Sequence, residues 1–150
     1  MIRIVLAIGA IAIGLGAAVA QQEAVAARRD LMKASAKLSY GVVRPMVRDQ
    51  APYQQAQVDA AFAEWTNMAE KLPGLFPVES LKGPDEGSNF YANPKIAESR
   101  TDFDGHIAKF RQVVADNKGK VTDLASLKAV YATLDESCNS CHQVYRLRKR

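Results

Sequence analysis

The sequence has few side chains that bind metals or form cross-links, with two cysteines and two histidines among 150 residues. Cys138 and Cys141 are only three residues apart, so a disulfide between them would close a tiny loop and stabilise little of the fold. A zinc site would need two more good ligands, and His106 lies in a different predicted helix from His142. The spacing of the two cysteines therefore needs another explanation.

The sequence also lacks a strong net charge. The formal charge is +4 at pH 7 and becomes +3 if Arg3 is removed with an N-terminal signal, which is too little to indicate a nucleic-acid-binding protein. Basic residues cluster at Arg146–Arg150, a run that is typical of a solvated helix end and that would also suit docking of an acidic redox partner. A glycine-rich phosphate loop, an internal repeat and a convincing strand pattern are missing.

The first twenty residues differ in character from the rest. Arg3 precedes an almost unbroken apolar run over residues 4–15, and Ala18-Val19-Ala20 has the small-x-small form of a signal peptidase site. The run is shorter than the roughly 20 apolar residues that a spanning helix needs, which disfavours a retained membrane anchor. We therefore predict that residues 1–20 are a cleaved signal peptide and that the exported protein is not stably inserted in a membrane.

Residues 21–150 fit one domain, and two helices are predicted in its first half. The first runs from about Gln22 to Arg48 with a wide apolar face, and Pro45 is expected to kink or end its last turn. The second carries an apolar stripe over residues 58–72 and stops at Pro73-Gly74.

Two more helices follow a long loop that is rich in proline and glycine. The third is predicted to begin at Pro94 and to end at residues 117–119. The fourth begins near Thr122 and carries an apolar heptad that includes Cys138 and Cys141. The pattern predicts an all-α, antiparallel four-helix bundle.

Cys138-Asn139-Ser140-Cys141-His142 is a C-x-x-C-H sequence, the attachment signature of c-type haem. Two thiols three residues apart on a helix can both bond the vinyl groups at one edge of a porphyrin, and the adjoining imidazole can approach the iron. A redox-active C-x-x-C pair is typical of a helix that follows a strand, whereas this motif lies near the end of the last helix. The motif predicts one covalently bound haem c, with His142 as the proximal iron ligand.

The motif with its continuation Gln143-Val144-Tyr145-Arg146, the turn at Gln50-Ala51-Pro52-Tyr53 and the exported four-helix plan resemble class II cytochromes c, the cytochrome c′ family. The resemblance covers essentially all of residues 21–150. It implies an up-down-up-down topology, a periplasmic location and a protein that is a monomer or a homodimer.

The resemblance also implies a choice at the distal side of the iron. High-spin members leave the sixth position empty beneath an apolar side chain of the first helix, and the low-spin cytochrome c-556 type places a methionine there. Met32 resembles that methionine, although a methionine at helical spacing is also typical of core packing. An ungapped alignment from the turn puts Lys33 where high-spin members place their distal apolar residue. This favours Met32, because a lysine is a poor apolar lid, although a deprotonated lysine could itself bind the iron. Arg146 resembles the arginine that the family places beside the proximal imidazole. Arg29 resembles the family's first-helix arginine, which lies near the distal face or a haem propionate.

Two functions follow from this choice. Ligation by His142 and Met32 would saturate the iron and make the protein a low-spin electron carrier for periplasmic or membrane redox proteins. An open distal site would instead make it a high-spin, five-coordinate protein that binds nitric oxide or carbon monoxide. A peroxidase-like enzyme is disfavoured, because the first helix offers no obvious distal acid-base histidine.

Overall fold

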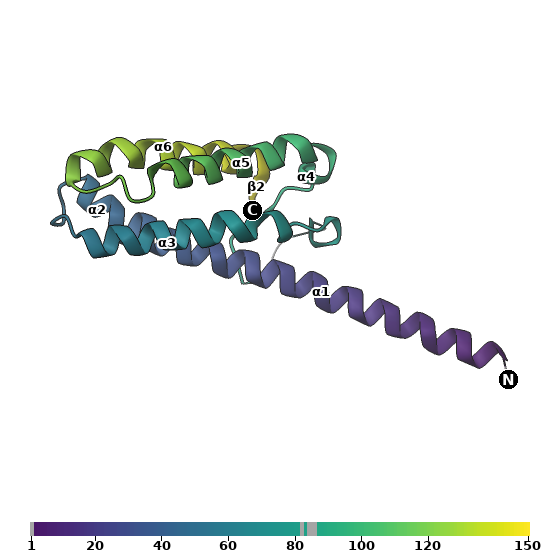
Figure 1. The fold of residues 1–150 in the computed structure, drawn as a ribbon. Coiled ribbons are helices and arrows are strands. Elements are labelled where there is room, and N and C mark those ends of the chain that lie inside the picture. The colour runs from purple at the N-terminus through teal and green to yellow at the C-terminus, as the bar shows by residue number, and fades with distance from the viewer. Residues whose placement is uncertain (1, 82, 84–86) are drawn as a thin grey trace.

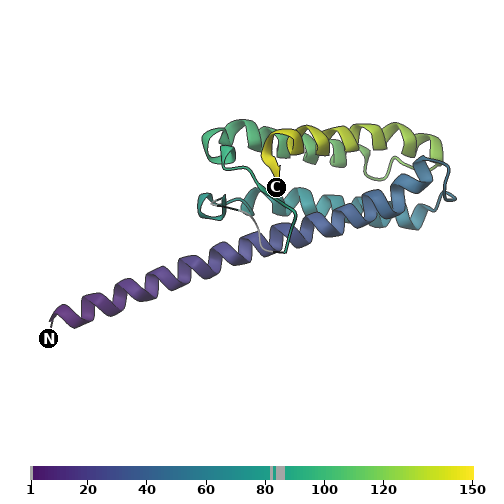
Figure 2. The same cartoon turned by 180° about the vertical axis from the view of Figure 1, so that it is seen from behind.

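The computed structural model describes residues 2–81, 83 and 87–150, with side chains from residue 19 onward within those ranges. Its four long helices form an antiparallel bundle, which confirms the predicted fold class (Figure 1). They are α1 (Ile2–Leu38), α3 (Gln55–Lys71), α5 (Arg100–Asn117) and α6 (Leu124–Tyr145). The N-terminal part of α1 extends beyond the bundle (Figure 2). Among the described residues, no helix combines the length and apolarity needed to cross a membrane.

The first bundle helix changes its hydrogen-bond pattern before Pro45. A π-helical segment, η1 (Ser39–Val43), follows α1 and leads into the short α2 (Arg44–Val47), and the N–H of Arg44 donates to the carbonyl of Ser39. Proline lacks an N–H and crowds the preceding turn, which explains a local shift away from α-helical bonding. The irregularity predicted at Pro45 is confirmed, although it begins one turn earlier and the helix continues to Val47.

The third bundle helix begins later than predicted. A short helix, α4 (Lys95–Glu98), follows Pro94, and the chain then leaves helical geometry at Ser99, where φ is −122° and ψ is 43°. The long helix α5 starts after this break. The prediction of one continuous helix from Pro94 was therefore wrong, although Pro94 does stand directly before α4.

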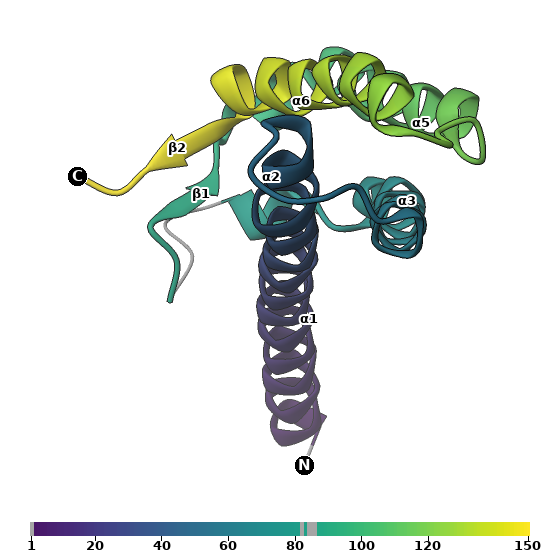
Figure 3. The same ribbon diagram turned by 90° about the vertical axis from the view of Figure 1, so that its left-hand side faces the viewer.

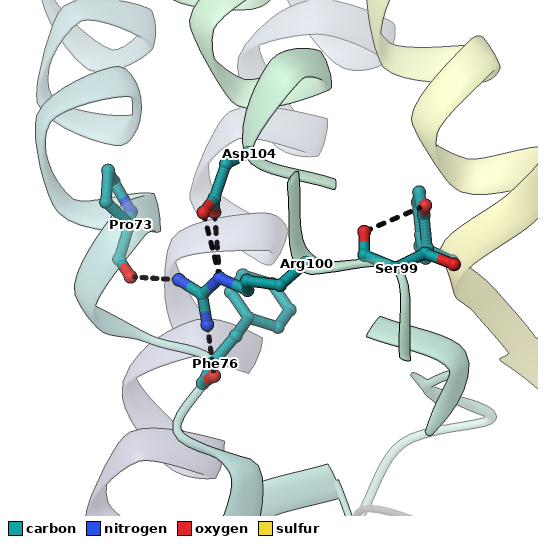
Figure 4. A network of polar contacts seen from close by, with 6 residues as sticks. Pro73, Phe76, Ser99, Arg100 and Asp104 are labelled. Carbon is teal, nitrogen blue, oxygen red and sulfur yellow. Dashed lines mark hydrogen bonds and ion pairs between the residues drawn. The ribbon is translucent and has the colours of Figure 1, made fainter. Parts of the chain in front are cut away.

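Arg100 ties the start of α5 to the segment that follows α3 (Figure 4). Its Nε atom lies 3.0 Å from both carboxylate oxygens of Asp104, and its Nη atoms donate to the carbonyls of Phe76 (3.1 Å) and Pro73 (3.3 Å). These contacts hold two segments that are distant in the sequence side by side at one end of the bundle.

The last helix, α6, begins with a reciprocal cap one residue after the predicted position. The Asp123 carboxylate accepts from the N–H of Ser126 at 2.7 Å, and the Ser126 hydroxyl accepts from the N–H of Asp123 at 3.2 Å. These bonds satisfy donors that a helix start leaves unpaired. The N-cap is thus Asp123 and not Thr122.

The C-terminal basic run is a strand and not the predicted helix end. Strand β2 (Arg146–Arg148) pairs antiparallel with β1 (Phe90–Ala92), whereas no strand was predicted. Asn93 explains where α6 stops, because its backbone N–H donates to the carbonyl of Tyr145 (2.9 Å) and its side chain to that of Val144 (3.0 Å). The carbonyls left open at the helix end are thereby satisfied by the residue after β1.

The two ends of the bundle differ in packing. At the end that holds α2, the start of α3 and the turn between α5 and α6, apolar side chains fill the interior, and this region is called the closed end. Side chains at this end that are at most 2% exposed include Val43, Met46, Val58, Val114, Val121 and Leu127.

Candidate functional site

A cavity of about 550 Å³ lies at the other end of the bundle, called the open end. Its walls come from α1, α5, α6, the segment around residues 72–76 and the segment 87–92. The volume falls within the range of about 300–1,000 Å³ that is typical of ligand and cofactor pockets. Among the described residues that line it, none is acidic.

The wall formed by α6 carries the second half of the C-x-x-C-H motif. Cys141 and His142, two of the residues predicted to hold the haem, line the cavity. Cys138 lies one turn earlier and lines a small adjoining hollow of about 20 Å³, and Tyr40 borders both spaces. Both cysteines are free thiols that are partly buried. The helix thus brings the two thiols to neighbouring positions at one side of the cavity.

Burial sets the protonation state of the motif. It lowers the pKa of His142 to about 4, with a smaller contribution from the positive charge of Arg146. It also raises the pKa of each cysteine to about 11. The next cause is the charge of Asp135 for Cys138, and the neighbouring Cys138 for Cys141. At neutral pH the imidazole is therefore uncharged and retains the nitrogen lone pair that metal ligation requires.

The wall formed by α1 carries both residues considered for the distal side. Met32 and Lys33 line the cavity together with the small Ala36. Met32 is half-buried and packs against the hydrophobic core, whereas Lys33 is exposed. The structure therefore brings Met32 into the same cavity as His142.

Arg28 is a buried residue of this wall that the sequence reasoning missed. It is only 4% exposed, its Nη1 atom donates to the Leu75 carbonyl and the Ser80 hydroxyl at 3.3 Å each, and its guanidinium lies 4.9 Å from the Phe76 ring centroid. Arg28 precedes Met32 by four residues, which places both on one face of α1. Arg29, three residues before Met32, is also its neighbour on the helix surface, so the spacing alone does not distinguish the two arginines.

Arg29 and Arg146, the two arginines predicted from the family resemblance, also line the cavity. Arg29 forms an ion pair with Asp30 at 3.1 Å. Arg146 stacks on the ring of Phe90, with 4.6 Å between the guanidinium carbon and the ring centroid, and its backbone N–H donates to the carbonyl of His142. The arginine and the histidine are thus joined through the last turn of α6.

Tyr145 connects the cavity to α5. Its hydroxyl donates to a carboxylate oxygen of Asp102 at 2.5 Å, and this bond is the main cause that raises the pKa of Tyr145 to about 12. His106 lies beside this pair, with its ring centroid 5.8 Å from that of Tyr145 and its Nδ1 atom 3.4 Å from the Ser140 hydroxyl. These contacts fix the end of α6, and with it the motif, against α5.

The residues present fit a covalently held haem. The Cys141 thiol, the uncharged imidazole of His142 and the thioether of Met32 border one largely apolar cavity, and the Cys138 thiol lies in the adjoining hollow. Arginines of the same cavity could balance the acidic groups of a cofactor. Imidazole and methionine are an established axial pair for haem iron.

Comparison with known proteins also points to a haem protein. The sequence model of the family described as Cytochrome C' matches residues 23–146. A cytochrome c-555 of Bradyrhizobium diazoefficiens is 34% identical over 99% of both chains, and a cytochrome c-556 of Rhodopseudomonas palustris is 36% identical over 97% of both. A solved structure of cytochrome c′ from Rhodopseudomonas palustris is 31% identical with a TM-score of 0.75, covering 85% of this chain and 98% of that one.

Proposed function

Because this chain belongs to the cytochrome c′ family, we propose that it is a periplasmic electron carrier whose haem iron is six-coordinate and low-spin, with His142 and Met32 as axial ligands. Members of the family are haem proteins without enzymatic activity and carry one covalent haem c.

In this proposal Cys138 and Cys141 hold the haem through thioether bonds, and His142 binds the iron from the same helix. Bound there, the haem would supply a ferric–ferrous couple, and a methionine ligand would raise its reduction potential. Burial of His142 supports its role, since a pKa of about 4 keeps the imidazole uncharged at any pH near neutral. Arg29 and Arg146, together with Arg28, would balance the two haem propionates.

The observation that carries the axial assignment is the position of Met32. Met46 and Met68 are buried in the core, and among the described residues Met32 is the one methionine that lines the cavity. Its neighbour Ala36 is small, which leaves room beside the thioether for a flat ring. A saturated iron has no position for a substrate, so the protein would exchange electrons with redox proteins of the periplasm or the membrane.

The periplasmic location depends on the predicted signal peptide. The family match begins at residue 23, just after the proposed cleavage point behind Ala20, which supports removal of residues 1–20. The mature chain would start at Gln21 as a monomer or a homodimer.

A second candidate is a high-spin protein that binds nitric oxide or carbon monoxide at an open distal site. The similarity to cytochrome c′ of Rhodopseudomonas palustris supports it. In that case Met32 would pack away from the iron.

The optical spectrum of the purified holoprotein separates the two candidates. Oxidised and reduced spectra are recorded, and carbon monoxide is then added to the reduced form. We expect sharp low-spin bands, a methionine-to-iron charge-transfer band in the oxidised form and no response to the gas. A high-spin spectrum that shifts promptly with carbon monoxide would overturn the electron-carrier proposal in favour of gas binding.

A further inference from the structure

The charged residues of the described chain are distributed unevenly around the bundle. Residues 28–44, the stretch of α1 and its continuation that includes the cavity-lining residues 28–40, contain five basic residues and one acidic residue. The C-terminal segment 146–150 contains four basic and no acidic residues, whereas α3 contains three acidic residues and one basic residue. In Figure 3 the β1–β2 ribbon lies on one side of α1 and α3 on the other. The side that carries the ribbon is therefore the positively charged one.

On α1 the positive charges follow one stripe beside the cavity. Lys33 and Tyr40 both line the cavity, and Lys37 falls between them at helical spacing. The guanidinium of Arg44 lies 5.4 Å from the centroid of the Tyr40 ring. Lys33 and Lys37 are exposed, and Tyr40 is 42% exposed. This stripe presents an aromatic ring flanked by cations.

The β1–β2 ribbon repeats this arrangement across the cavity opening. Phe90 is opposite Arg148 in the register, so their side chains leave the same face of the ribbon, and Arg146, two residues before Arg148, shares that face. Phe90 and Arg146 line the cavity, which shows the direction in which the face points. Phe90 is 41% exposed and carries the guanidinium of Arg146 on its ring.

Aromatic residues and arginines are enriched among the residues that contribute most of the binding energy at protein interfaces. We propose that Lys33, Lys37, Arg44, Arg146 and Arg148, called the cationic rim, form with Tyr40 and Phe90 the docking surface for an acidic redox protein. This inference rests on the proposed electron-carrier function, since the rim surrounds the cavity assigned to the haem. The two haem propionates would offset part of the positive charge of Arg146, which lines the cavity. Lys37, Arg44 and Arg148 would keep the surface positive.

The surface is tested by electron exchange between the reduced holoprotein and small oxidants of opposite charge. Stopped-flow oxidation is followed with ferricyanide, an anion, and with tris(phenanthroline)cobalt(III), a cation. In each reaction one electron passes from the ferrous protein to the complex, and no bond forms or breaks. Rates are compared at about 0.01 M and about 0.1 M ionic strength, where the screening length falls from about 30 to about 10 Å.

A rim variant and a matched control locate the effect. The rim variant is Lys37→Glu with Arg148→Glu, and the control is Lys109→Glu with Lys118→Glu, two exposed lysines in and directly after α5. Both pairs change two charges from +1 to −1 and so lower the formal charge equally. At low ionic strength, we expect the rim variant to be oxidised by ferricyanide roughly tenfold more slowly than the unmodified protein. Its oxidation by the cobalt complex should be faster, because electrostatic steering now favours the cation. The control should change each rate less than about twofold.

Binding of poly-L-glutamate, a probe for an acidic protein surface, gives a second readout. In ¹⁵N NMR spectra of the reduced holoprotein, we expect its addition to shift amides of residues 33–44, 90–92 and 146–148, and the rim variant to lose these shifts. Equal rates in the rim and control variants, or shifts spread over α3 and α5, would overturn the docking surface. Failure of the electron-carrier proposal is distinguishable, because it appears as carbon monoxide binding by the unmodified protein while the charge dependence of these rates stays measurable.

Discussion

The two ends of the bundle are built from the same helices but are completed in different ways. At the closed end, Val43, Met46 and Leu127 fill the interior with apolar side chains that are at most 1% exposed. At the open end the helices surround a cavity of about 550 Å³, and Met32, Cys141 and His142 remain half-buried. Interiors of folded proteins are normally packed close to the density of organic crystals. The closed end is therefore complete by itself, whereas the open end leaves the space that the proposed haem would fill.

Polar contacts link distant segments around the cavity. At the open end, Arg100 and Asn93 hold the segments around the cavity by donating to backbone carbonyls, and Tyr145 donates to Asp102. These bonds fix the frame of the site and leave its lining largely apolar. A rigid frame around a cofactor keeps its ligands in place when its charge changes.

Removal of both thiols should have the largest effect. In the variant Cys138→Ala with Cys141→Ala, we expect complete loss of covalently bound haem, because no other side chain at the cavity can form a thioether bond. Haem absorbance that stays with the chain after denaturing gel electrophoresis provides the measurement. Ser140→Ala, which leaves the spacing of the motif intact, is the matched control and should keep its haem. Haem that remains covalently bound to the double variant would contradict the assignment.

Truncation of a side chain at the closed end should have the next largest effect, on stability alone. Met46 is 1% exposed, and Met46→Ala is expected to lower the free energy of unfolding of the holoprotein by about 2–5 kcal/mol. Denaturant titration followed by circular dichroism measures the loss. The optical spectrum should be unchanged, since Met46 lies away from the cavity. An altered spectrum would show that the two ends are not independent.

Alkaline pH should produce a smaller effect that starts at the open end. The pKa of Tyr145 is raised to about 12, while a tyrosine in the unfolded chain titrates near 10. The unfolded state therefore loses its proton first, and the stability that this group contributes is complete below about pH 10 and lost as the pH rises to about 12.

Urea midpoints of the holoprotein at several pH values across this range measure the effect. Tyr145→Phe should show a shallower decline than the unmodified protein, with some decline remaining because the pKa of Tyr131 is also raised to about 12. Identical slopes for the two proteins would mean that the Tyr145–Asp102 bond does not survive in solution.

Most of the closed end was predictable from the sequence, because its features are local or periodic. The apolar stripes located the four helices, and Pro45 indicated the irregularity that the structure places at η1. The C-x-x-C-H motif likewise predicted the cofactor without any tertiary information, since its chemistry is contained in five consecutive residues.

The frame of the open end was not predictable, because it depends on contacts between distant segments. The pairing of β1 with β2 joins residues more than fifty positions apart, and neither strand has the length at which alternation becomes visible. Asn93, which is distant in the sequence, binds the carbonyl of Val144 at the end of α6. This contact is not visible in the sequence, so the basic run that follows α6 resembled a helix end. Arg28 was overlooked in favour of Arg29, because two adjacent arginines cannot be assigned to a face before the helix phase relative to the cavity is known.

The comparison of Met32→Ala with Met68→Ala tests the central claim most directly, because only Met32 lines the cavity and Met68 is 6% exposed in the core. Optical spectra of both holoproteins are recorded with and without carbon monoxide. We expect Met32→Ala to lose the methionine-to-iron band, become high-spin and bind the gas, whereas Met68→Ala should be less stable but spectroscopically unchanged. A low-spin spectrum in Met32→Ala that still ignores carbon monoxide would contradict ligation by Met32.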